Sequence, residues 1–423
     1  MEAPEGTVRI PCTTSRPFRQ VSTTIHSTAE LDALVIGGGV AGLWCLDALT
    51  EAGLDAALLE STALGTGQSI SAQGILHGGV KYSLSGLLAP ASSAIAEMPQ
   101  RWDQSLSGTV APDLRQATIR TNACHLWRTD SIRSRAGMVG AKLALRVRPQ
   151  TLAPADRPEV LRTCPGEVAL LPEKVIETPS LLQALSKPHT DRLVLGTLIS
   201  GDARAAELAE LTIRTADDSE LHVRARRVIL TAGAGTPELM KRLQLGPDDA
   251  TMQRRPLHMA MVKGPPERLP ELNGHCADGG QTRVTITSST SRDQQRVWQL
   301  GGALAEQGCN QAPDALIQAA KTCLNQVLPG FDAEDPSYTW ATYRIDRAEK
   351  MTSSTRRHSG GWVGRTGSAL IAWPTKLVLA PATATQILEH CPRAASSTPS
   401  GSPIGDHPTP PIADPPWEEA TWH

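Results

Sequence analysis

The chain has 423 residues, a formal net charge of −2 and a hydrophobic content of 40%. This length predicts two or three structural units with an ordinary apolar core. The near-neutral charge argues against a nucleic-acid partner and against polybasic attachment to a membrane.

The first predicted elements form a βαβ unit. LDALVIGG is a short β-rich run, and LDAALLES is the next strand. Between them, VAGLWCLDALTEAG places apolar residues at Leu43, Leu46 and Leu49 before Gly53, which fits a helix and its C-terminal cap. A strand, a helix and a second strand in this order are typical of a parallel sheet.

A G-x-G-x-x-G motif, formed by Gly37, Gly39 and Gly42, lies between the strand and the helix. Gly37 permits a tight turn, Gly39 lets the backbone approach a pyrophosphate, and Gly42 lets the helix pack closely on the strand. The helix begins at Val40 and Ala41, where free amides and the dipole favour a phosphate. The motif therefore predicts a dinucleotide site.

Glu60 ends the second strand, where a carboxylate can accept hydrogen bonds from a ribose diol. The glycine-rich stretch GTGQSISAQGILHGG follows directly. A plain NAD domain would continue with a helix here. So much glycine indicates either a loose turn or a backbone lying against a large, flat ligand. Together with the later stretches RRVILTAGAG and GSALIAWPTKLVLAPATATQILEH, it favours FAD over NAD.

The rest of the chain alternates between two patterns. SLLQALSK predicts a short helix after Pro179, and RRVILTAGAG predicts a buried strand ending in small residues. GSALIAWPTKLVLAPATATQILEH predicts a loop running into a helix. Basic and apolar residues alternate in 96–150 and 246–343, which predicts a second, antiparallel sheet.

The predicted fold is α/β, a Rossmann-type FAD-binding domain with an inserted, mainly antiparallel β-sheet substrate domain. The tail is rich in Pro and Ser and has no apolar period, so we expect it to be disordered. The predicted segments are a flexible leader (1–30), the FAD-binding domain (31–95, 151–245 and 344–391), the substrate domain (96–150 and 246–343) and the disordered tail (392–423).

The eight cysteines are scattered and form no CxxC pair. This spacing argues against a zinc knuckle and a flavin–disulfide pair, and we predict no metal site. Residues 1–30 contain no secretory signal, and no apolar run is long enough to span a bilayer. We therefore expect reduced thiols, a cytoplasmic location and no integral membrane segment.

Three segments, 32–82, about 175–235 and 340–390, resemble the D-amino-acid oxidase superfamily of flavoproteins. This superfamily includes glycine oxidase, FAD-dependent glycerol-3-phosphate dehydrogenase and L-2-hydroxyglutarate dehydrogenase. The glycine motif, Glu60, GQS and GILHGGVKY occur in family order, and LHGGVKY is most similar to the glycerol-3-phosphate and 2-hydroxyglutarate branch. The predicted substrate domain resembles no member, so the substrate stays open.

The resemblance implies that the loop at 66–79 passes beside the pyrophosphate, the ribityl chain and the flavin ring. Ser69 and Ser71 would donate hydrogen bonds to phosphate oxygens. The residues predicted to bind FAD are Gly37, Gly39, Val40, Ala41, Gly42, Glu60, Ser61, Gln68, Ser69, Gln73, Gly74, Thr231, Ala232, Gly233, Pro374, Thr375, Lys376 and Leu377.

The resemblance also implies three catalytic residues, His77, Lys376 and Arg344. His77, at the edge of the ring, would take a hydroxyl proton, unless it is a turn histidine without chemical function. Lys376 would stabilise the negative charge of reduced flavin, unless it is a solvated surface lysine. Arg344 would hold a substrate carboxylate or phosphate, unless it or Arg347 belongs to an internal salt bridge.

These residues predict an FAD-dependent oxidase or dehydrogenase. It would transfer hydride from a CH–OH or CH–NH bond of a small anionic metabolite to flavin N5. The flavin is expected to be non-covalent, because the covalent branch resembles WHAAG rather than LHGG. Oxygen or a quinone would accept the electrons. Two alternatives stay open, a flavoenzyme acting on tRNA or a cofactor precursor, and a flavin-binding scaffold without turnover.

Overall fold

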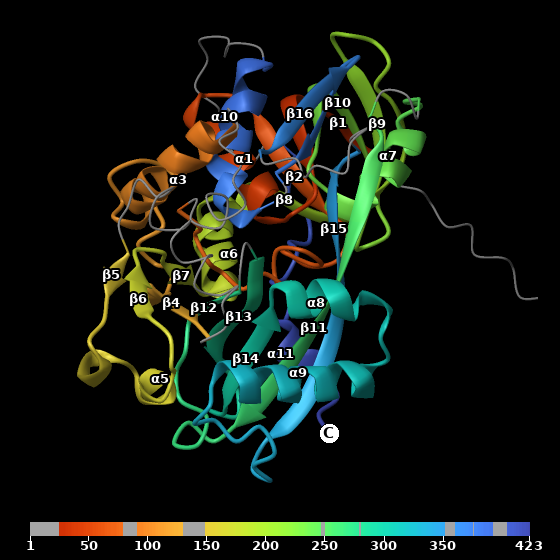
Figure 1. Cartoon of the computed structure of the whole chain (residues 1–423). Helices are drawn as coiled ribbons and strands as arrows, with labels where there is room; N and C mark the ends of the chain where they lie inside the picture. The colour runs from red at the N-terminus through yellow and green to blue at the C-terminus, as the bar shows by residue number, and fades with distance from the viewer. Residues whose placement is uncertain are drawn as a thin grey trace, which may run out of the picture.

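The computed structural model describes residues 25–78, 91–129, 149–246, 250–278, 281–351, 360–374, 376–391 and 404–423. These residues form two large β-sheets, one toward each end of the molecule, with helices packed on their faces (Figure 1). The long strand β15 (Thr339–Lys350) belongs to the lower sheet and runs up toward the other one (Figure 1).

The first sheet has seven strands. Its central strand β1 pairs in parallel with β2 and β10, and β10 pairs in parallel with β17. Ala33, Leu34 and Val35 are at most 1% exposed, because both faces of the parallel region are covered. The strands are β1 (Ile25–Ile36), β2 (Ala56–Glu60), β8 (Leu193–Asp202), β9 (Ala209–Thr215), β10 (Glu220–Leu230), β16 (Trp362–Thr366) and β17 (Ala369–Trp373).

Helices cover both faces of this sheet. One face packs with Ala33 and Val35 against α1 (Val40–Glu51), α3 (Ala91–Leu106), α6 (Thr178–Ser186) and α10 (Ala380–Glu389). The other face packs with Leu34 and Ile36 against α7 (Thr236–Arg242). Successive residues of β1 thus enter different cores, as the alternation of side chains along a strand requires.

The second sheet has eight strands, in the order β15-β11-β14-β13-β12-β4-β6-β5. Its pairings are antiparallel except for β12 with β4. The strands not yet given are β4 (Cys124–Arg128), β5 (Gln150–Thr151), β6 (Val168–Leu171), β11 (Met252–Gly264), β12 (Gly274–Asp278), β13 (Gln281–Thr290) and β14 (Arg296–Gly301).

The amphipathic helix α9 (Pro313–Val327) covers one face of the second sheet. Its buried residues recur every three or four positions, which lays one apolar stripe on the strands. The remaining elements are the strand pair β3 (Ile119–Thr121) and β7 (Val175–Ile176), the helices α5 (Glu159–Arg162), α8 (Ala303–Gln307) and α11 (Pro416–Glu419), and the 3-10 turns η1 (Pro154–Asp156), η2 (Lys187–Arg192), η3 (Gly233–Gly235), η4 (Gly308–Asn310) and η5 (Leu377–Leu379).

The predicted α/β fold with an antiparallel second sheet is confirmed, but several predicted boundaries differ from the strands. β1 begins at Ile25, inside the predicted leader, and β17 lies where a loop was expected. The predicted FAD-binding segment 151–245 contains β6, which belongs to the second sheet, and β15 crosses the predicted border at 343–344. The predicted substrate segment 96–150 contains part of α3, which packs on the first sheet. The sequence of a short apolar run does not indicate which of two sheets the strand will join, so these boundaries could not be predicted.

The prediction of a disordered tail is wrong for residues 404–423. Residues 392–403 lie outside the described residues. Residues 408–413 hydrogen-bond to the backbone of Leu64 and Leu195 beside the first sheet. Farther on, Trp417 is 4% exposed against the second sheet, and His423 pairs with Trp340. Contacts with the first sheet at 408–413 and with the second sheet at Trp417 and His423 thus order a segment whose composition predicts disorder.

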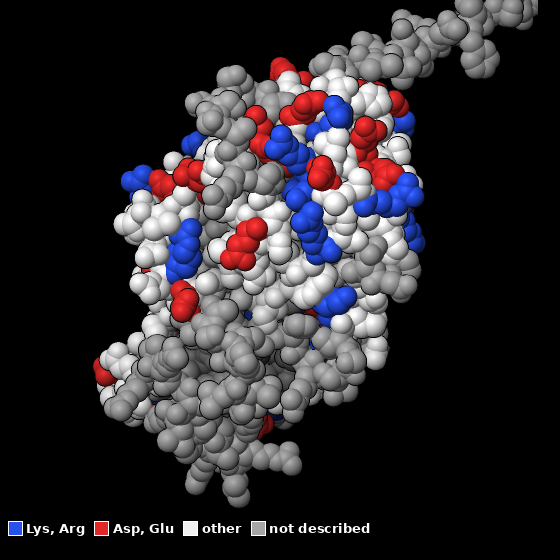
Figure 2. Space-filling view, turned by 90° about the horizontal axis from the view of Figure 1, so that it is seen from above, with Lys and Arg blue, Asp and Glu red and all other residues white. Residues whose placement is uncertain are grey.

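The described surface shows no dominant charge of one sign on the face seen from above. Lys and Arg side chains lie interspersed with Asp and Glu over the first sheet and its helices (Figure 2). Among the described residues, no helix is both long enough and apolar enough to cross a bilayer. The predicted cytoplasmic location stays a prediction, and all seven described cysteines are unpaired.

Candidate active site

A cavity of about 690 Å³ lies where the two sheets meet. Its volume falls within the range of roughly 300–1,000 Å³ that is usual for cofactor and substrate pockets. One wall consists of the carboxyl ends of β1, β2 and β10 with the start of α1, and the opposite wall consists of β11, β13, β14 and β15. Open α/β sheets bind ligands at this end of their strands.

The glycine motif forms the turn from β1 into α1. Gly37, with φ of +114°, lies so close to the β10 end that a Cβ would stand 2.7 Å from Ala232. Gly39 lines the cavity, and a Cβ there would meet the Ser69 hydroxyl at 2.9 Å. Gly42 does not line it, since its missing Cβ would lie 2.0 Å from the Gly37 carbonyl oxygen. Gly42 therefore serves the packing of helix on turn rather than ligand contact.

Glu60 lies at the end of β2 and lines the cavity. The Gly38 amide donates to its Oε2 at 2.7 Å, and the amides of Ser61 and Thr62 donate to its Oε1 at 2.9 and 3.0 Å. These bonds fix the orientation of the carboxylate. Both oxygens can accept further hydrogen bonds, since a carboxylate offers about four lone pairs.

The loop after Glu60 follows the cavity wall as far as His77. Ser69 Oγ accepts the Val40 amide at 3.1 Å, and the Gln68 side chain accepts the Ala348 amide at 3.3 Å. Gln73 lines the cavity, but its amide nitrogen donates to Thr285 and Gln299 carbonyls of the second sheet.

Gly74 lies in the same loop, with φ of +76°. Its missing Cβ would lie 2.0 Å from the Ile176 carbonyl oxygen. Gln73 therefore anchors the loop to the second sheet, and Gly74 permits a close approach to β7. Both predicted cofactor residues have a structural role besides their place on the wall.

Most of the remaining predicted residues on the wall follow the ends of β10 and β17. Thr231 donates from its hydroxyl to the Gly37 carbonyl at 2.9 Å, and Gly233 accepts from the Trp373 indole at 3.2 Å. Thr375 lies outside the described residues. The other predicted residues that line the cavity are Val40, Ala41, Ser61, Ala232, Pro374, Lys376 and Leu377.

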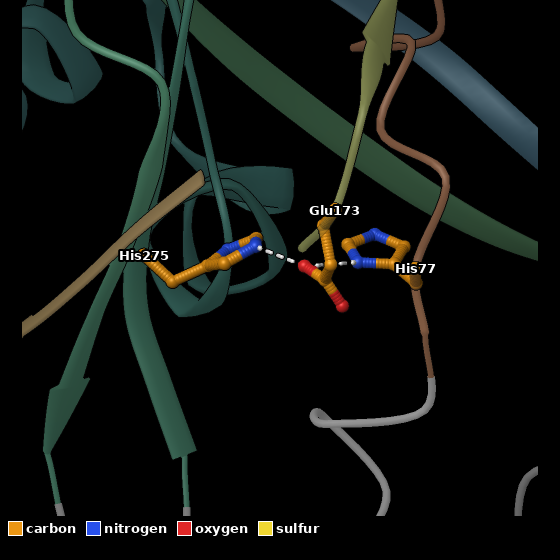
Figure 3. A group of neighbouring side chains, drawn as sticks. All are labelled: His77, Glu173 and His275. Carbon is orange, nitrogen blue, oxygen red and sulfur yellow. Dashed lines mark hydrogen bonds and ion pairs between the residues drawn. The ribbon is translucent and has the colours of Figure 1, made fainter. Parts of the chain in front are cut away.

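His77 lines the cavity and lies against a buried carboxylate. Its Nδ1 stands 3.6 Å from Oε2 of Glu173, and Nε2 of His275 stands 3.3 Å from the same oxygen (Figure 3). The side chain of Glu173 is 2% exposed, against 23% for that of His77. Burial alone would raise the pKa of Glu173, but hydrogen bonds from the two histidines, and their positive charges when they are protonated, outweigh it and hold this pKa well below its usual range.

The three side chains also form a set of metal-ligand types. Their donor atoms all lie within 4.8 Å of one another, and two histidines with a carboxylate could bind a divalent ion. Sequence reasoning missed this cluster, because Glu173 lies about a hundred residues beyond His77, and His275 lies about a hundred residues beyond Glu173. Neither residue belongs to a recognisable motif.

The predicted substrate arginine does not face the cavity. Arg344 is exposed, and its guanidinium donates to the carbonyls of Cys309 and Gln311 in the turn after α8. Arg347, three residues farther along β15, does line the cavity, 3.5 Å from Glu306. The prediction of Arg344 as the anion-binding residue is therefore wrong in position, because residues three apart in a strand point to opposite faces.

Comparison with known proteins places this geometry in a family. The family model described as "FAD dependent oxidoreductase" (DAO) matches residues 32–366. The chain belongs to the DAO family of FAD-dependent oxidoreductases. A "probable FAD-dependent oxidoreductase", PA4991 of Pseudomonas aeruginosa, is 38% identical over 393 residues, which are 92% of this chain and 98% of that protein. Its crystal structure superposes with a TM-score of 0.74 over 93% of this chain and 99% of that one, at 33% identity.

Similarity to two further proteins is narrower or is confined to the fold. Mitochondrial glycerol-3-phosphate dehydrogenase of Rattus norvegicus is 47% identical over 60 residues, which are 14% of this chain and only 8% of that protein. L-α-glycerophosphate oxidase from Mycoplasma pneumoniae, solved with FAD bound, has a TM-score of 0.62 at 12% identity and covers 90% of this chain and 99% of its own. At 12% identity, the match to L-α-glycerophosphate oxidase shows a shared fold alone.

FAD is the cofactor of the DAO family, and the residues of this cavity fit it. The wall is shaped by glycines, and a Cβ on Gly67 or Gly233, both with positive φ, would meet no protein atom within 4 Å. These positions therefore leave open space beside the backbone. The α1 N-terminus and the fixed Glu60 carboxylate supply the donors and the acceptor that a pyrophosphate and a ribose need.

Lys376 provides a test of where this DAO protein holds the flavin ring. We expect Lys376→Met to lower the midpoint potential of the bound flavin by about 10–30 mV. This corresponds to ~0.5–1.5 kcal/mol for one lost hydrogen bond to a two-electron couple. Sulfite, which forms an adduct favoured by nearby positive charge, should bind more weakly. The control is Lys241→Met on α7, where the lysine is 78% exposed. An unchanged potential and sulfite affinity would remove Lys376 from the flavin site.

Proposed function

We propose that this protein oxidises a CH–OH bond of a small anionic metabolite. FAD, when bound, supplies the acceptor for the hydride. The observation that carries the proposal is His77, an imidazole on the cavity wall with the Glu173 carboxylate behind it. Oxidation of an alcohol requires a base for the hydroxyl proton, and an imidazole backed by a carboxylate suits that task.

The charged groups on the second-sheet wall support an anionic substrate. Arg347 lines the cavity from β15, and its planar fork matches a carboxylate or phosphate. The loop after β2 and the second sheet thus place an imidazole and a guanidinium on the wall of the same cavity. The local similarity to glycerol-3-phosphate dehydrogenase, limited to 60 residues, makes a hydroxy compound that carries a phosphate group the first probe.

A second candidate, oxidation of a CH–NH bond, is favoured by Glu306. This carboxylate lies 3.5 Å from Arg347, and both line the cavity. Together they match the ammonium and carboxylate groups of an amino acid. The fold is shared with glycine oxidase from Geobacillus kaustophilus, at a TM-score of 0.59 and 15% identity.

An anaerobic substrate panel tests both candidates. The holoenzyme would be mixed with sn-glycerol 3-phosphate, L-2-hydroxyglutarate, glycine, L-proline and iminodiacetate, and bleaching of the flavin followed in the visible range. Bleaching by a hydroxy compound supports the first candidate, and bleaching by an amine alone supports the second. A flavin that no small molecule reduces would favour a macromolecular substrate, such as tRNA, or a scaffold. If a compound of the panel reduces the flavin, oxygen and a quinone would be compared as electron acceptors for the reduced enzyme.

The flavin is expected to be released by acid precipitation. His77 lies in an LHGG sequence, whereas the covalent branch resembles WHAAG, and its Nδ1 lies 3.6 Å from Oε2 of Glu173. After precipitation of the holoenzyme, the yellow colour should move to the supernatant. A coloured pellet whose tryptic peptide carries flavin on His77 would contradict this prediction and would favour amine oxidation.

A further inference from the structure

The carboxylate of Glu173 is enclosed by donors on both of its oxygens. The Gly78 amide donates to Oε1 at 2.9 Å, while His275 and His77 approach Oε2 at 3.3 and 3.6 Å. Figure 3 shows the carboxylate lying between the two imidazoles, each from a different part of the chain. Such a buried charge is maintained only where donors surround it.

We propose that Glu173 is a positioning residue that fixes the tautomer of His77. Nδ1 of His77 carries the proton and donates it toward Glu173, so the unprotonated Nε2, on the other side of the ring, serves the cavity as proton acceptor. This inference rests on the proposed function for its catalytic meaning, but the tautomer itself can be observed without any substrate.

The second histidine keeps Glu173 in place. Nδ1 of His275 lies 3.0 Å from the Thr285 hydroxyl, and its Nε2 lies toward Glu173. If Thr285 donates to Nδ1, the only proton of a neutral His275 is on Nε2, where it is donated to the carboxylate. Since Thr285 also lines the cavity, the chain from His77 through Glu173 and His275 ends at the same cavity where it begins.

The charges balance during proton transfer. Before it, the ionised Glu173 accepts from two neutral imidazoles and one amide. The substrate hydroxyl then gives its proton to Nε2 of His77, and the O–H electron pair remains with the substrate oxygen. The resulting imidazolium lies next to the Glu173 carboxylate, which stabilises it by opposite charge. Cys124 on β4 also lies near Glu173, and burial together with that negative charge raises the pKa of its thiol and keeps it protonated.

The variant Glu173→Gln reverses the predicted tautomer without a large change of shape. Because the Gly78 amide requires an acceptor at the Oε1 position, the Gln oxygen takes that place, and its NH₂ group faces both imidazoles. This NH₂ group donates to Nδ1 of His77, and the His77 proton moves to Nε2. His275 can reverse in the same way, because the Thr285 hydroxyl can accept as well as donate. The matched control is Glu167→Gln, at a surface carboxylate that accepts from Thr151.

The experiment is nitrogen NMR of the FAD-bound protein with ¹⁵N-imidazole histidine, above the pH range of histidine titration. His77→Gln and His275→Gln assign the two signals among the eleven histidines. We expect the His77 proton on Nδ1 in the wild type and in Glu167→Gln, and on Nε2 in Glu173→Gln. A wild-type proton on Nε2, or no change in Glu173→Gln, overturns the proposal. If Glu173→Gln does not fold, the wild-type tautomer still decides.

Two further measurements separate the alternatives. A stoichiometric divalent metal in the purified wild type that is lost from Glu173→Gln would make the cluster a metal site and overturn the proposal. With sn-glycerol 3-phosphate as probe, Glu173→Gln should slow flavin reduction at least a hundredfold while leaving FAD content unchanged. If this probe and the rest of the panel fail to reduce wild-type flavin but the tautomer reverses as expected, the proposed function fails and the positioning role stands.

Discussion

Gly39→Val is expected to yield a folded protein that purifies without FAD. Gly39 lies at the N-cap of α1 with φ of −73°, a value that valine tolerates, so the backbone is not strained. Its first side-chain carbon would stand 2.9 Å from Ser69 Oγ, which accepts the Val40 amide on the cavity wall. The branched side chain would therefore fill the space over the helix N-terminus where a pyrophosphate is bound. The measurement is the ratio of flavin to protein absorbance, with circular dichroism as the check on folding.

Gly235→Ala is the matched control for this variant. Gly235 also lines the cavity, and its φ of −81° is open to alanine. The new methyl group would meet its nearest neighbour, the Ala232 Cβ, at an ordinary 3.8 Å. The control should keep its flavin. Full flavin occupancy in Gly39→Val would mean that the pyrophosphate lies elsewhere.

The flavin half of the site could be predicted from sequence because its signals are local. Gly37, Gly39 and Glu60 stand within one βαβ unit, whose geometry follows from the order of its elements. The sequence does not reveal which atom lies next to each glycine in the folded protein. Gly42 and Gly74 are required by carbonyl oxygens of Gly37 and Ile176 rather than by a ligand.

The substrate half could not be predicted, because long-range pairing assembles it. Glu173 follows the short strand β6, and His275 lies in β12, which pairs in parallel with β4. No periodicity in the sequence reveals that these strands bring the two residues to His77. Composition misled in the same way at residues 404–423, where Pro-rich sequence is ordered by contacts with both sheets.

The choice between Arg344 and Arg347 depends on one structural fact that the sequence lacks, namely which face of β15 borders the cavity. Both lie in β15, and the sequence TYRIDRAEK places them three residues apart. Their spacing puts them on opposite faces of the strand, but which face borders the cavity depends on the pairing of β15 with β11. That register is a property of the fold and is invisible in the local pattern.

Arg347→Gln is therefore expected to weaken flavin reduction about ten- to a hundredfold, while Arg344→Gln leaves it nearly unchanged. Loss of one charge-assisted hydrogen bond to an anion costs ~1.5–3 kcal/mol, which gives this range. The Arg347 guanidinium lies 3.5 Å from Glu306 on the cavity wall, and its several N–H donors can also serve a bound anion. Arg344 is occupied by two backbone carbonyls on the exposed face and has no access to the cavity.

The measurement that separates these arginines is stopped-flow reduction of the flavin against concentration of the panel compound that bleaches the wild type. If Arg347 binds the anion, the half-saturating concentration should rise with the charge removed, and Arg347→Lys should recover part of the loss, since a lysine keeps the charge but not the fork. FAD content should be the same in all three variants, because Arg347 lies on the second-sheet wall, away from the glycine turn. Equal, small effects of Arg347→Gln and Arg344→Gln would contradict the prediction. They would instead indicate that Glu306 faces the substrate and that Arg347 only balances its charge, the arrangement expected for an amine.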